Sequence, residues 1–243
     1  MSESLELKDH YRSDIQGLRG LAVLLVVVYH TGFAIPGGFV GVDMFFVISG
    51  FVITQVLMRE VELTGKVSLK DFYFRRARRL IPALSLVMVF TILVSIVTMS
   101  PFGEQQQIFK TAIASVFFGG NIHLFAMNSY DALTNNPLRH LWSLGVEEQF
   151  YWVFPLFFIG LMKFSSFRLD SKRIKVCLWV VSLGSFLIGL ALTNGFEFGY
   201  REGTEIERQL GFLSKIGFIP GKDWPTKFAF FGAPARFWEI LVG

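Results

Sequence analysis

The sequence predicts an all-α protein, a polytopic bundle of transmembrane helices. Of its 243 residues, 52% are hydrophobic and only 17% are charged, whereas a soluble domain typically has about 25% charged residues. Several apolar stretches are also long enough to cross a hydrocarbon core of about 30 Å. These observations exclude a disordered chain, an ordinary cytosolic enzyme and a protein that binds nucleic acid.

Seven apolar segments follow a polar start. We expect residues 1–13 to be a cytoplasmic tail and residues 14–243 to form the membrane domain. The segments are 18–33, 40–58, 80–99, 108–127, 141–162, 176–192 and 228–243. No small-residue cleavage site follows the first segment, so it should be a retained helix rather than a signal peptide. The seventh looks like the opening of a further helix, so we expect the domain to be incomplete at its C-terminus.

Positive charge predicts the orientation of the segments. Residues 59–79 hold seven basic and three acidic side chains, and residues 163–175 hold five basic and one acidic. Both stretches should therefore be cytoplasmic. They can share that side only if segment 108–127 does not cross, so we favour a re-entrant segment there, with 128–137 and 194–227 outside. The alternative is a single crossing, with the charge rule broken at the second stretch.

The first segment carries two ionisable residues, Arg19 and His30. A charged side chain deep in a bilayer costs about 2.5–3.5 kcal/mol by insertion scales, so each is a candidate for function. Eleven residues of helix rotate by about 1100°, close to three full turns, so the two share one face about 16.5 Å apart. The alternative is that Arg19 reaches the headgroups and His30 caps the helix end.

The second and fifth segments carry carboxylates. Asp43 opens the second segment, where it could simply favour the positive end of the helix dipole. Glu147 and Glu148 are adjacent, so they cannot face the same way, and at least one should point into a protein cavity. His140 lies seven residues before Glu147 and shares its face, with Ser143 between them. We take Asp43 and Glu147 as candidate catalytic groups; the alternative for the glutamates is an interfacial belt.

Four arginines, Arg75, Arg76, Arg78 and Arg79, directly precede the third segment. Guanidinium groups suit bidentate contacts with phosphate, but the same cluster would also anchor a helix at the cytoplasmic surface, and composition does not separate these roles. The chain has no Gly-rich nucleotide loop and no metalloprotease or serine-hydrolase motif. Its one cysteine, Cys177, offers neither a disulfide nor a thiolate metal site, and we expect no bound metal.

Five sequence blocks occur in one order along the chain. They are RSDIQGLRGLA (12–22) followed by YH (29–30), GVDMFFVISGF (41–51), FYFRRARRLIP (72–82), HLWSLGVEEQFY (140–151) and RFWE (236–239). Together they resemble acyltransferase family 3, integral membrane proteins that O-acylate, most often O-acetylate, cell-surface carbohydrates. Any one block would be weak evidence, whereas five in sequence make a chance match improbable.

The resemblance implies a fold of about ten spans, of which six to seven would be present here. It also implies an arginine and a histidine on the first helix with ten residues between them, matched by Arg19 and His30. The family's Arg-x-x-Arg pattern before the third helix is matched twice, by Arg75 with Arg78 and by Arg76 with Arg79. Some members carry an additional extracytoplasmic hydrolase-like domain.

The residues and the resemblance lead to one functional hypothesis. The donor would be acyl-CoA, with no permanently bound cofactor, and its phosphates would bind Arg19 and the four arginines at the cytoplasmic face. His30 would accept the proton of a hydroxyl on a surface polysaccharide or lipid-linked glycan, and Asp43 or Glu147 would orient it. A covalent acetyl-histidine relay is a second route.

This hypothesis places the chain in the inner (plasma) membrane as a multi-pass protein in contact with membrane lipids. A transporter or flippase would also place charges inside a bundle, but it predicts an internal repeat, and none is found. A non-catalytic membrane scaffold is the third possibility, and the presence of both Arg19 and His30 argues against it.

Overall fold

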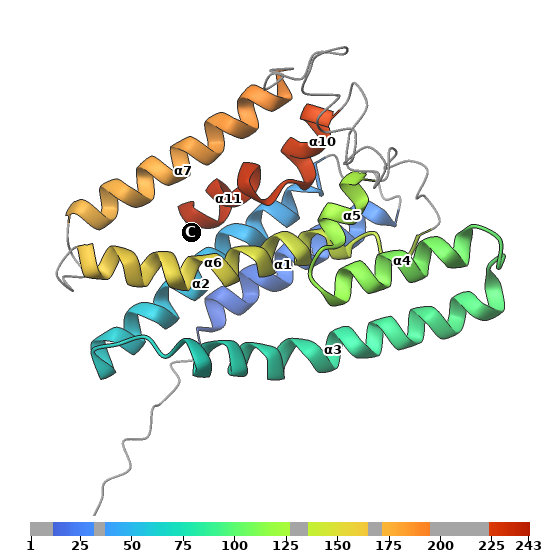
Figure 1. Cartoon of the computed structure of the whole chain (residues 1–243), viewed down its shortest axis with the longest axis horizontal. Coiled ribbons are helices and arrows are strands. Elements are labelled where there is room, and N and C mark those ends of the chain that lie inside the picture. Colours follow the sequence, from blue (N-terminus) through green and yellow to red (C-terminus); the bar gives the residue numbers. More distant parts are fainter. Residues whose placement is uncertain (1–11, 32–36, 127–135, 165–171, 195–223) are drawn as a thin grey trace, which may run out of the picture.

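The structure, a computed structural model, describes residues 12–31, 37–126, 136–164, 172–194 and 224–243 (Figure 1). Every regular element among them is a helix, which confirms the all-α class. The helices are α1 (Ser13–His30), α2 (Val40–Thr64), α3 (Leu69–Thr98), α4 (Glu104–Val116), α5 (Gly120–Ala126), α6 (Leu141–Phe164), α7 (Lys172–Thr193), α10 (Trp224–Phe231) and α11 (Ala233–Val242).

Within the described residues, three helices are long and apolar enough to cross a membrane: α2, α3 and α7. Six or seven such segments were expected. Helix α1 differs because its first two turns include Asp14 and Arg19, and α6 differs because Glu147 and Glu148 lie about two turns from its start. Helix α3 exposes large apolar side chains, among them Leu86, Phe90 and Val97. Such a surface is stable in contact with lipid, as the predicted membrane protein requires.

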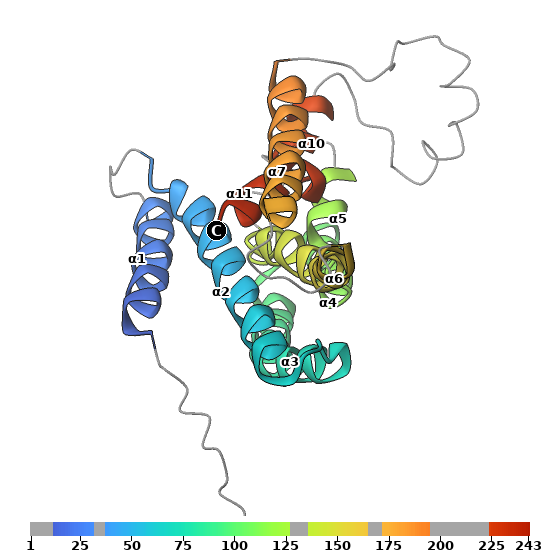
Figure 2. The same ribbon diagram turned by 90° about the vertical axis from the view of Figure 1, so that its left-hand side faces the viewer.

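Helix α6 forms the centre of the packing. Its Val146, Phe150 and Phe154 are less than 5% exposed, and Figure 2 shows α6 enclosed by other helices, while α1 lies at the edge beyond α2. Small residues allow close helix approach. A Cβ at Gly41 would collide with the Ala22 carbonyl of α1, and one at Gly50 with the Ile240 carbonyl of α11.

Helix α3 begins eleven residues before the predicted third segment. Ser68 caps it, because its Oγ accepts a hydrogen bond from the Asp71 N–H at 3.4 Å. This cap is a recognisable helix-start signal, but hydropathy hides the charged turns that follow it. The four arginines therefore lie on the helix and not in a loop, and their directions follow helical geometry. Pro82 lies inside the same helix.

Segment 108–127 is divided into two short helices. Helices α4 and α5, of 13 and 7 residues, are about 20 and 10 Å long, too short to cross. The chain turns at Phe118, whose φ is +55°. Gln149 of α6 holds this turn, because its Nε2 donates to the Phe118 carbonyl at 2.9 Å and to Asn121 Oδ1 at 2.8 Å. A broken segment is what the re-entrant interpretation expects.

The last segment, 228–243, was expected as one helix and is instead broken into α10 and α11. Gly232 at the break is extended, with ψ 115°. Pro234 then stands in the first turn of α11, where its missing N–H costs nothing. Ser185 of α7 fastens the start of α11, since its Oγ donates to the Pro234 carbonyl at 2.6 Å and accepts from the Trp238 N–H at 2.9 Å.

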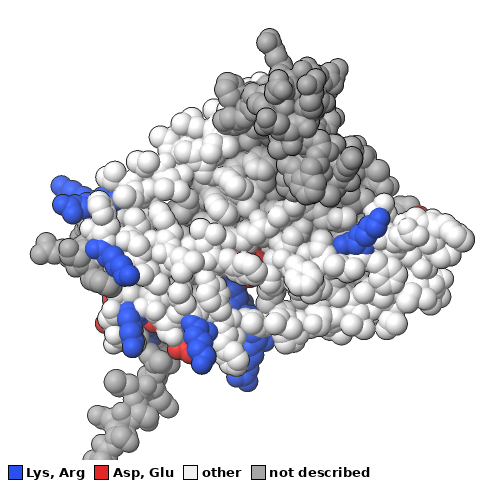
Figure 3. All heavy atoms as spheres, in the orientation of Figure 1, with Lys and Arg blue, Asp and Glu red and all other residues white. Residues whose placement is uncertain are grey.

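Helix ends and charge agree about orientation. The end of α2, the start of α3, the end of α6 and the start of α7 all lie on the left of Figure 1. Lysine and arginine side chains gather over the same side in Figure 3. We call this side the cationic end (residues 59–79, 163–164 and 172–175). Two stretches, 128–137 and 194–227, were expected outside. Residues 128–135 and 195–223 of them lie beyond the described residues.

Candidate functional site

A basic pocket lies where α1, α2, α3 and α6 meet near the cationic end. Arg19 of α1 faces three of the four arginines of α3 across it, and its volume is about 190 Å³. Its lining residues are Arg19, Val52, Ile53, Val56, Phe72, Arg75, Arg76, Arg79 and Tyr151. Arg78 does not line this pocket. The convergence of Arg19 with the later arginines is the arrangement that a donor-phosphate site needs.

The arginines of the basic pocket differ in how far their charges are satisfied. Arg75 is paired with Glu60 at 3.2 Å, in an exposed contact. The Nε of Arg19 is buried without a hydrogen-bond partner, and its guanidinium lies 5.5 Å from the Phe45 ring. Arg79 makes no hydrogen bond or ion pair with any residue that the structure describes. Arg19 and Arg79 therefore have donors left for a ligand, and neither is held by a carboxylate of the described residues.

Arg76 is the best satisfied of the set. Its Nε donates to both Glu148 oxygens at 2.9 Å, and its Nη2 forms a further ion pair with Glu148. The guanidinium also covers the Tyr151 ring at 3.3 Å and lies 3.8 Å from Glu147. Ion pairs this well enclosed hold helices in register, and removing one partner leaves a buried charge. Arg76 thus joins α3 to α6 rather than offering a free cation.

Glu147 is buried and accepts two hydroxyl hydrogen bonds. Ser49 of α2 donates from Oγ at 2.6 Å, and Tyr151 donates from Oη at 2.9 Å to the same carboxylate oxygen. The expectation that one of the two adjacent glutamates points into the protein is met by both, at 6% and 2% exposure. Both can be buried because α6 is surrounded on most sides. Sequence reasoning missed Ser49 and Tyr151 as the hydrogen-bond partners of Glu147.

His30 ends α1 and is exposed. Its Nδ1 lies 2.8 Å from the Val26 carbonyl oxygen. A carbonyl oxygen only accepts, so Nδ1 carries a hydrogen, and in the neutral imidazole Nε2 is then the nitrogen with the free lone pair. The imidazole edge packs against Tyr29, with ring centroids 5.3 Å apart. A neutral imidazole of this tautomer, open at Nε2, can accept a proton.

Asp43 or Glu147 was expected to orient His30. Neither of the two carboxylates is hydrogen-bonded to it. Asp43 instead forms an ion pair with Arg236 of α11, which also binds Glu239 at 2.8 Å. The reason is helix register. Gly41 lies against Ala22, eight residues before His30, which is about 12 Å along α1. The RFWE block was a visible signal, but nothing in the sequence pairs Arg236 with Asp43.

His140 lies just before α6, outside the membrane-spanning segments. Its Nδ1 is 2.8 Å from the Pro137 carbonyl, which gives it the same tautomer as His30. Desolvation lowers the pKa of His140, and the nearby His30 lowers it further, although the contact with Pro137 opposes both. Ser143, expected on the same face, donates to the His140 carbonyl at 3.2 Å.

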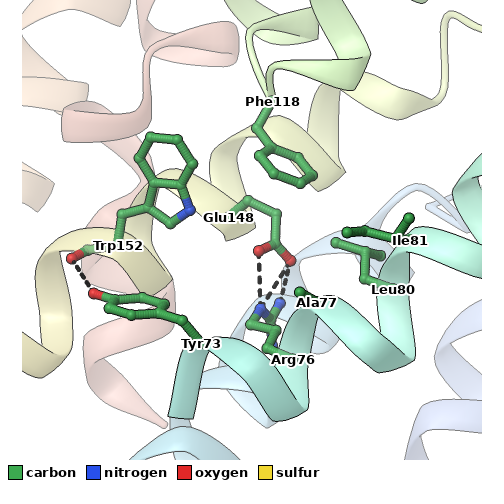
Figure 4. Close-up of a pocket in the computed structure, with 8 residues that line it drawn as sticks. All are labelled: Tyr73, Arg76, Ala77, Leu80, Ile81, Phe118, Glu148 and Trp152. Atoms are coloured by element: carbon green, nitrogen blue, oxygen red, sulfur yellow. Dashed lines mark hydrogen bonds and ion pairs between the residues drawn. The ribbon is translucent and has the colours of Figure 1, made fainter. Parts of the chain in front are cut away.

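A second cavity, the lateral cavity, lies beside the basic pocket on a neighbouring face of α3, between α3 and α6. Its volume is about 490 Å³, and its lining residues are Tyr73, Arg76, Ala77, Leu80, Ile81, Phe118, Glu148 and Trp152 (Figure 4). The Arg76–Glu148 pair forms its charged floor, so Arg76 lines both cavities. No sequence pattern indicated this cavity, because it needs the Phe118 turn beside α6. No group of three metal-ligating side chains occurs within the described ranges.

The fold and these clusters define an integral membrane protein whose helices enclose arginines and carboxylates at one end and present an imidazole on α1. A family model described as an acyltransferase domain matches residues 12–219. The chain therefore belongs to acyltransferase family 3, as the sequence blocks indicated. No solved structure matches it.

Two curated relatives are similar to the chain. The peptidoglycan O-acetyltransferase OatA of Listeria monocytogenes is 34% identical over 251 residues, covering all of this chain and 35% of the relative. The O-acetyltransferase OatA of Staphylococcus aureus is 36% identical over 192 residues, covering 78% of this chain and 30% of the relative. The chain thus spans about a third of the length of the curated relatives it matches.

Proposed function

We propose that this chain is the donor-handling part of a plasma-membrane O-acetyltransferase, which moves an acetyl group from acyl-CoA to a carbohydrate hydroxyl. Membership of the family supports acyl transfer, and the names of both relatives support acetyl as the group. The name of the Listeria relative supports peptidoglycan as the acceptor. The observation that carries the proposal is the basic pocket, which Arg19 and Arg79 line from different helices. The Nε of Arg19 is buried without a partner, and Arg79 is exposed and has no partner among the described residues.

Acyl-CoA is a donor that suits this pocket. Its phosphates are anionic, and guanidinium groups bind phosphate through charge-assisted hydrogen bonds. The pocket is smaller than the roughly 300–1,000 Å³ of a site for a whole drug-sized ligand, so it would hold a phosphate-bearing part and leave the rest of the donor outside. The cationic end is the cytoplasmic side by the distribution of basic residues, and acyl-CoA is made in the cytoplasm.

His30 would act at the other end of α1. Nε2 accepts the proton of the acceptor hydroxyl, and the hydroxyl oxygen attacks the carbonyl carbon of the thioester. The carbon–sulfur bond breaks, and the CoA thiolate leaves and takes up the proton from the imidazolium. Val26 holds the ring by its carbonyl, which keeps Nε2 as the basic nitrogen. General base catalysis of this kind contributes about 10²–10⁴-fold in rate.

The test separates binding from chemistry. Arg79→Ala and Arg19→Ala should each weaken binding of a non-hydrolysable acyl-CoA analogue about 10–150-fold, since a hydrogen bond to a charged group is worth about 1.5–3 kcal/mol. His30→Ala should retain analogue binding and lose acetyl transfer. Arg12→Ala is the control, because Arg12 is exposed and pairs with Asp14 at 2.7 Å. Normal transfer by His30→Ala would rule out His30 as the base.

A further inference from the structure

We propose that the lateral cavity between α3 and α6 binds an anionic phospholipid. One acyl chain would enter the cavity, and the phosphate would pair with Arg78 and Lys70 at its mouth. This site lies on a neighbouring face of α3 and shares only Arg76 with the basic pocket, so the proposal does not depend on the donor assigned to that pocket.

The chemistry of the cavity fits a hydrocarbon chain. Its walls are supplied by aliphatic side chains such as Leu80 and Ile81 and by the ring of Phe118. The only charged groups, Arg76 and Glu148, are paired with each other across its floor. An ionic ligand would find no unmatched charge there. At about 490 Å³ the cavity has the size of a ligand site.

The mouth of the cavity faces lipid. Ile81 and Trp152, on its two sides, are each 53% exposed. Helix α3 is a candidate membrane span, and only 11% of its most apolar window is buried. The acyl chains of the surrounding lipids therefore reach the mouth of the cavity. Trp152 and Tyr73 are the kinds of residue that favour the boundary between chain and headgroup, and Tyr73 is fixed there because its Oη donates to the Trp152 carbonyl at 2.9 Å.

Two cations lie where a headgroup would be. Arg78 precedes Ile81 by three residues and Lys70 precedes Tyr73 by three, so each is one helical turn from a lining residue, towards the cationic end. Both side chains are exposed. Neither makes a hydrogen bond or ion pair with another residue within the described ranges. Arg78 was expected at the donor site but does not line the basic pocket.

A protein helix would be a poor occupant of the lateral cavity. A helix with its side chains is about 10–12 Å across, so a space of about 490 Å³ would hold little more than one turn of it. A polyprenyl phosphate shares the aliphatic chain and the anionic head. We propose the phospholipid as the occupant, because it is the anionic amphiphile that surrounds the exposed mouth of the cavity in the membrane. Polyprenyl phosphate is tested as a competitor in the experiment below.

The experiment uses the full chain in phosphatidylcholine nanodiscs. These are doped with phosphatidylglycerol that carries a photoactivatable group in its acyl chain, and labelled peptides are mapped by mass spectrometry. We expect labelling of the peptides that contain Ile81 and Trp152, about 30-fold above that by phosphatidylcholine with the same probe, because each of the two basic residues contributes about 1 kcal/mol near an anionic surface. Exposed α3 positions distant from the cavity should show no such preference.

Variants separate a built site from general lipid contact. Ala77→Phe fills the cavity and should abolish labelling, whereas Ala83→Phe, exposed on the same helix outside the cavity, should not. Ile81→Trp blocks the half-exposed mouth and replaces Ala77→Phe should the latter fail to fold. Arg78→Gln should reduce the preference for phosphatidylglycerol to about fivefold, because Lys70 still contributes about 1 kcal/mol. Replacing Lys70 by glutamine as well should reduce labelling to the phosphatidylcholine level, and Lys172→Gln on α7 is the control.

Three results would overturn the proposal. The first is labelling spread evenly over α3, which indicates only general lipid contact. The second is full labelling in both cavity-blocking variants. The third is displacement of the probe by polyprenyl phosphate at concentrations at which unlabelled phosphatidylglycerol does not compete, which would make a lipid-linked glycan carrier the occupant.

Discussion

Arg76 and Arg79 are three residues apart on α3, yet their surroundings give them different roles. Arg76 is bound by Glu148 and covered by Tyr151, while Arg79 faces the basic pocket without a described partner. A repeated Arg-x-x-Arg pattern treats them as equivalent. The difference arises only because α6 brings its carboxylates to one of them.

Replacing Arg76 by alanine should therefore reduce stability, whereas replacing Arg79 by alanine should reduce donor binding. Arg76→Ala leaves two buried carboxylates without their cation and should destabilise the protein by about 3–5 kcal/mol. Arg79→Ala should leave stability nearly unchanged and weaken donor binding. Thermal unfolding in detergent, followed by circular dichroism, measures the first effect, and analogue binding measures the second. Equal unfolding temperatures for the two variants would contradict the assignment of Arg76 as a helix-joining residue.

Among the helices, α6 depends on close approach to the broken segment formed by α4 and α5. Gly145 of α6 lies against the amide of Asn121, and a Cβ added there would be 2.7 Å from Asn121 Oδ1. Asn121 in turn donates to the Phe231 carbonyl at 2.9 Å, so the same contact reaches α10. The missing side chain at position 145 therefore allows three elements to meet.

Glycine substitutions on α6 test this contact with a matched control. Gly145→Ala should destabilise the protein by about 1–3 kcal/mol, the range for overpacking a tight interior. Gly160→Ala, on the same helix with nothing within 4 Å of its added Cβ, should be neutral or slightly stabilising, because alanine favours a helix by up to about 1 kcal/mol. Thermal unfolding of both variants measures the effect. Equal losses of stability in the two variants would contradict the close approach of α6 to Asn121.

For the whole molecule, the positions of the helix ends imply one orientation. The cationic end should face the cytoplasm, which places the turn between α3 and α4 on the outside. Phe102 in that turn is 88% exposed, and Lys66 between α2 and α3 is exposed at the opposite end. The two positions therefore report on the two sides of the membrane.

Cysteine labelling of intact cells tests the orientation. In a Cys177→Ala background, Phe102→Cys should react with a membrane-impermeant maleimide, and Lys66→Cys should react only after the membrane is opened. Labelling of position 66 in sealed cells would reverse the orientation and, with it, the cytoplasmic placement of the basic pocket. Reaction of both positions with a permeant maleimide is the control for accessibility.

Much of the architecture follows from local chemistry. Val40 begins α2 where apolar residues follow a glycine turn, and segments 141–162 and 176–192 become α6 and α7 with shifts of no more than four residues. Apolar stretches of this length have few alternatives in a bilayer, because only helices satisfy their own backbone. The start of α3 at Leu69 was missed because its first turns are charged and hydropathy does not detect them.

The sequence by itself determined the class of the protein, its family and which charged residues lie in apolar segments. Both the free-energy cost of a charge in a membrane and the family's sequence blocks are local properties of the chain. Tertiary structure alone decided which charges meet. Arg76 finds Glu148 across 72 residues and Asp43 finds Arg236 across 193. Such pairs depend on helix register and on the turn at Phe118. Packing between segments that are distant in the sequence sets both. That is why Arg19 and Arg79 remain available for a ligand while Arg76 does not.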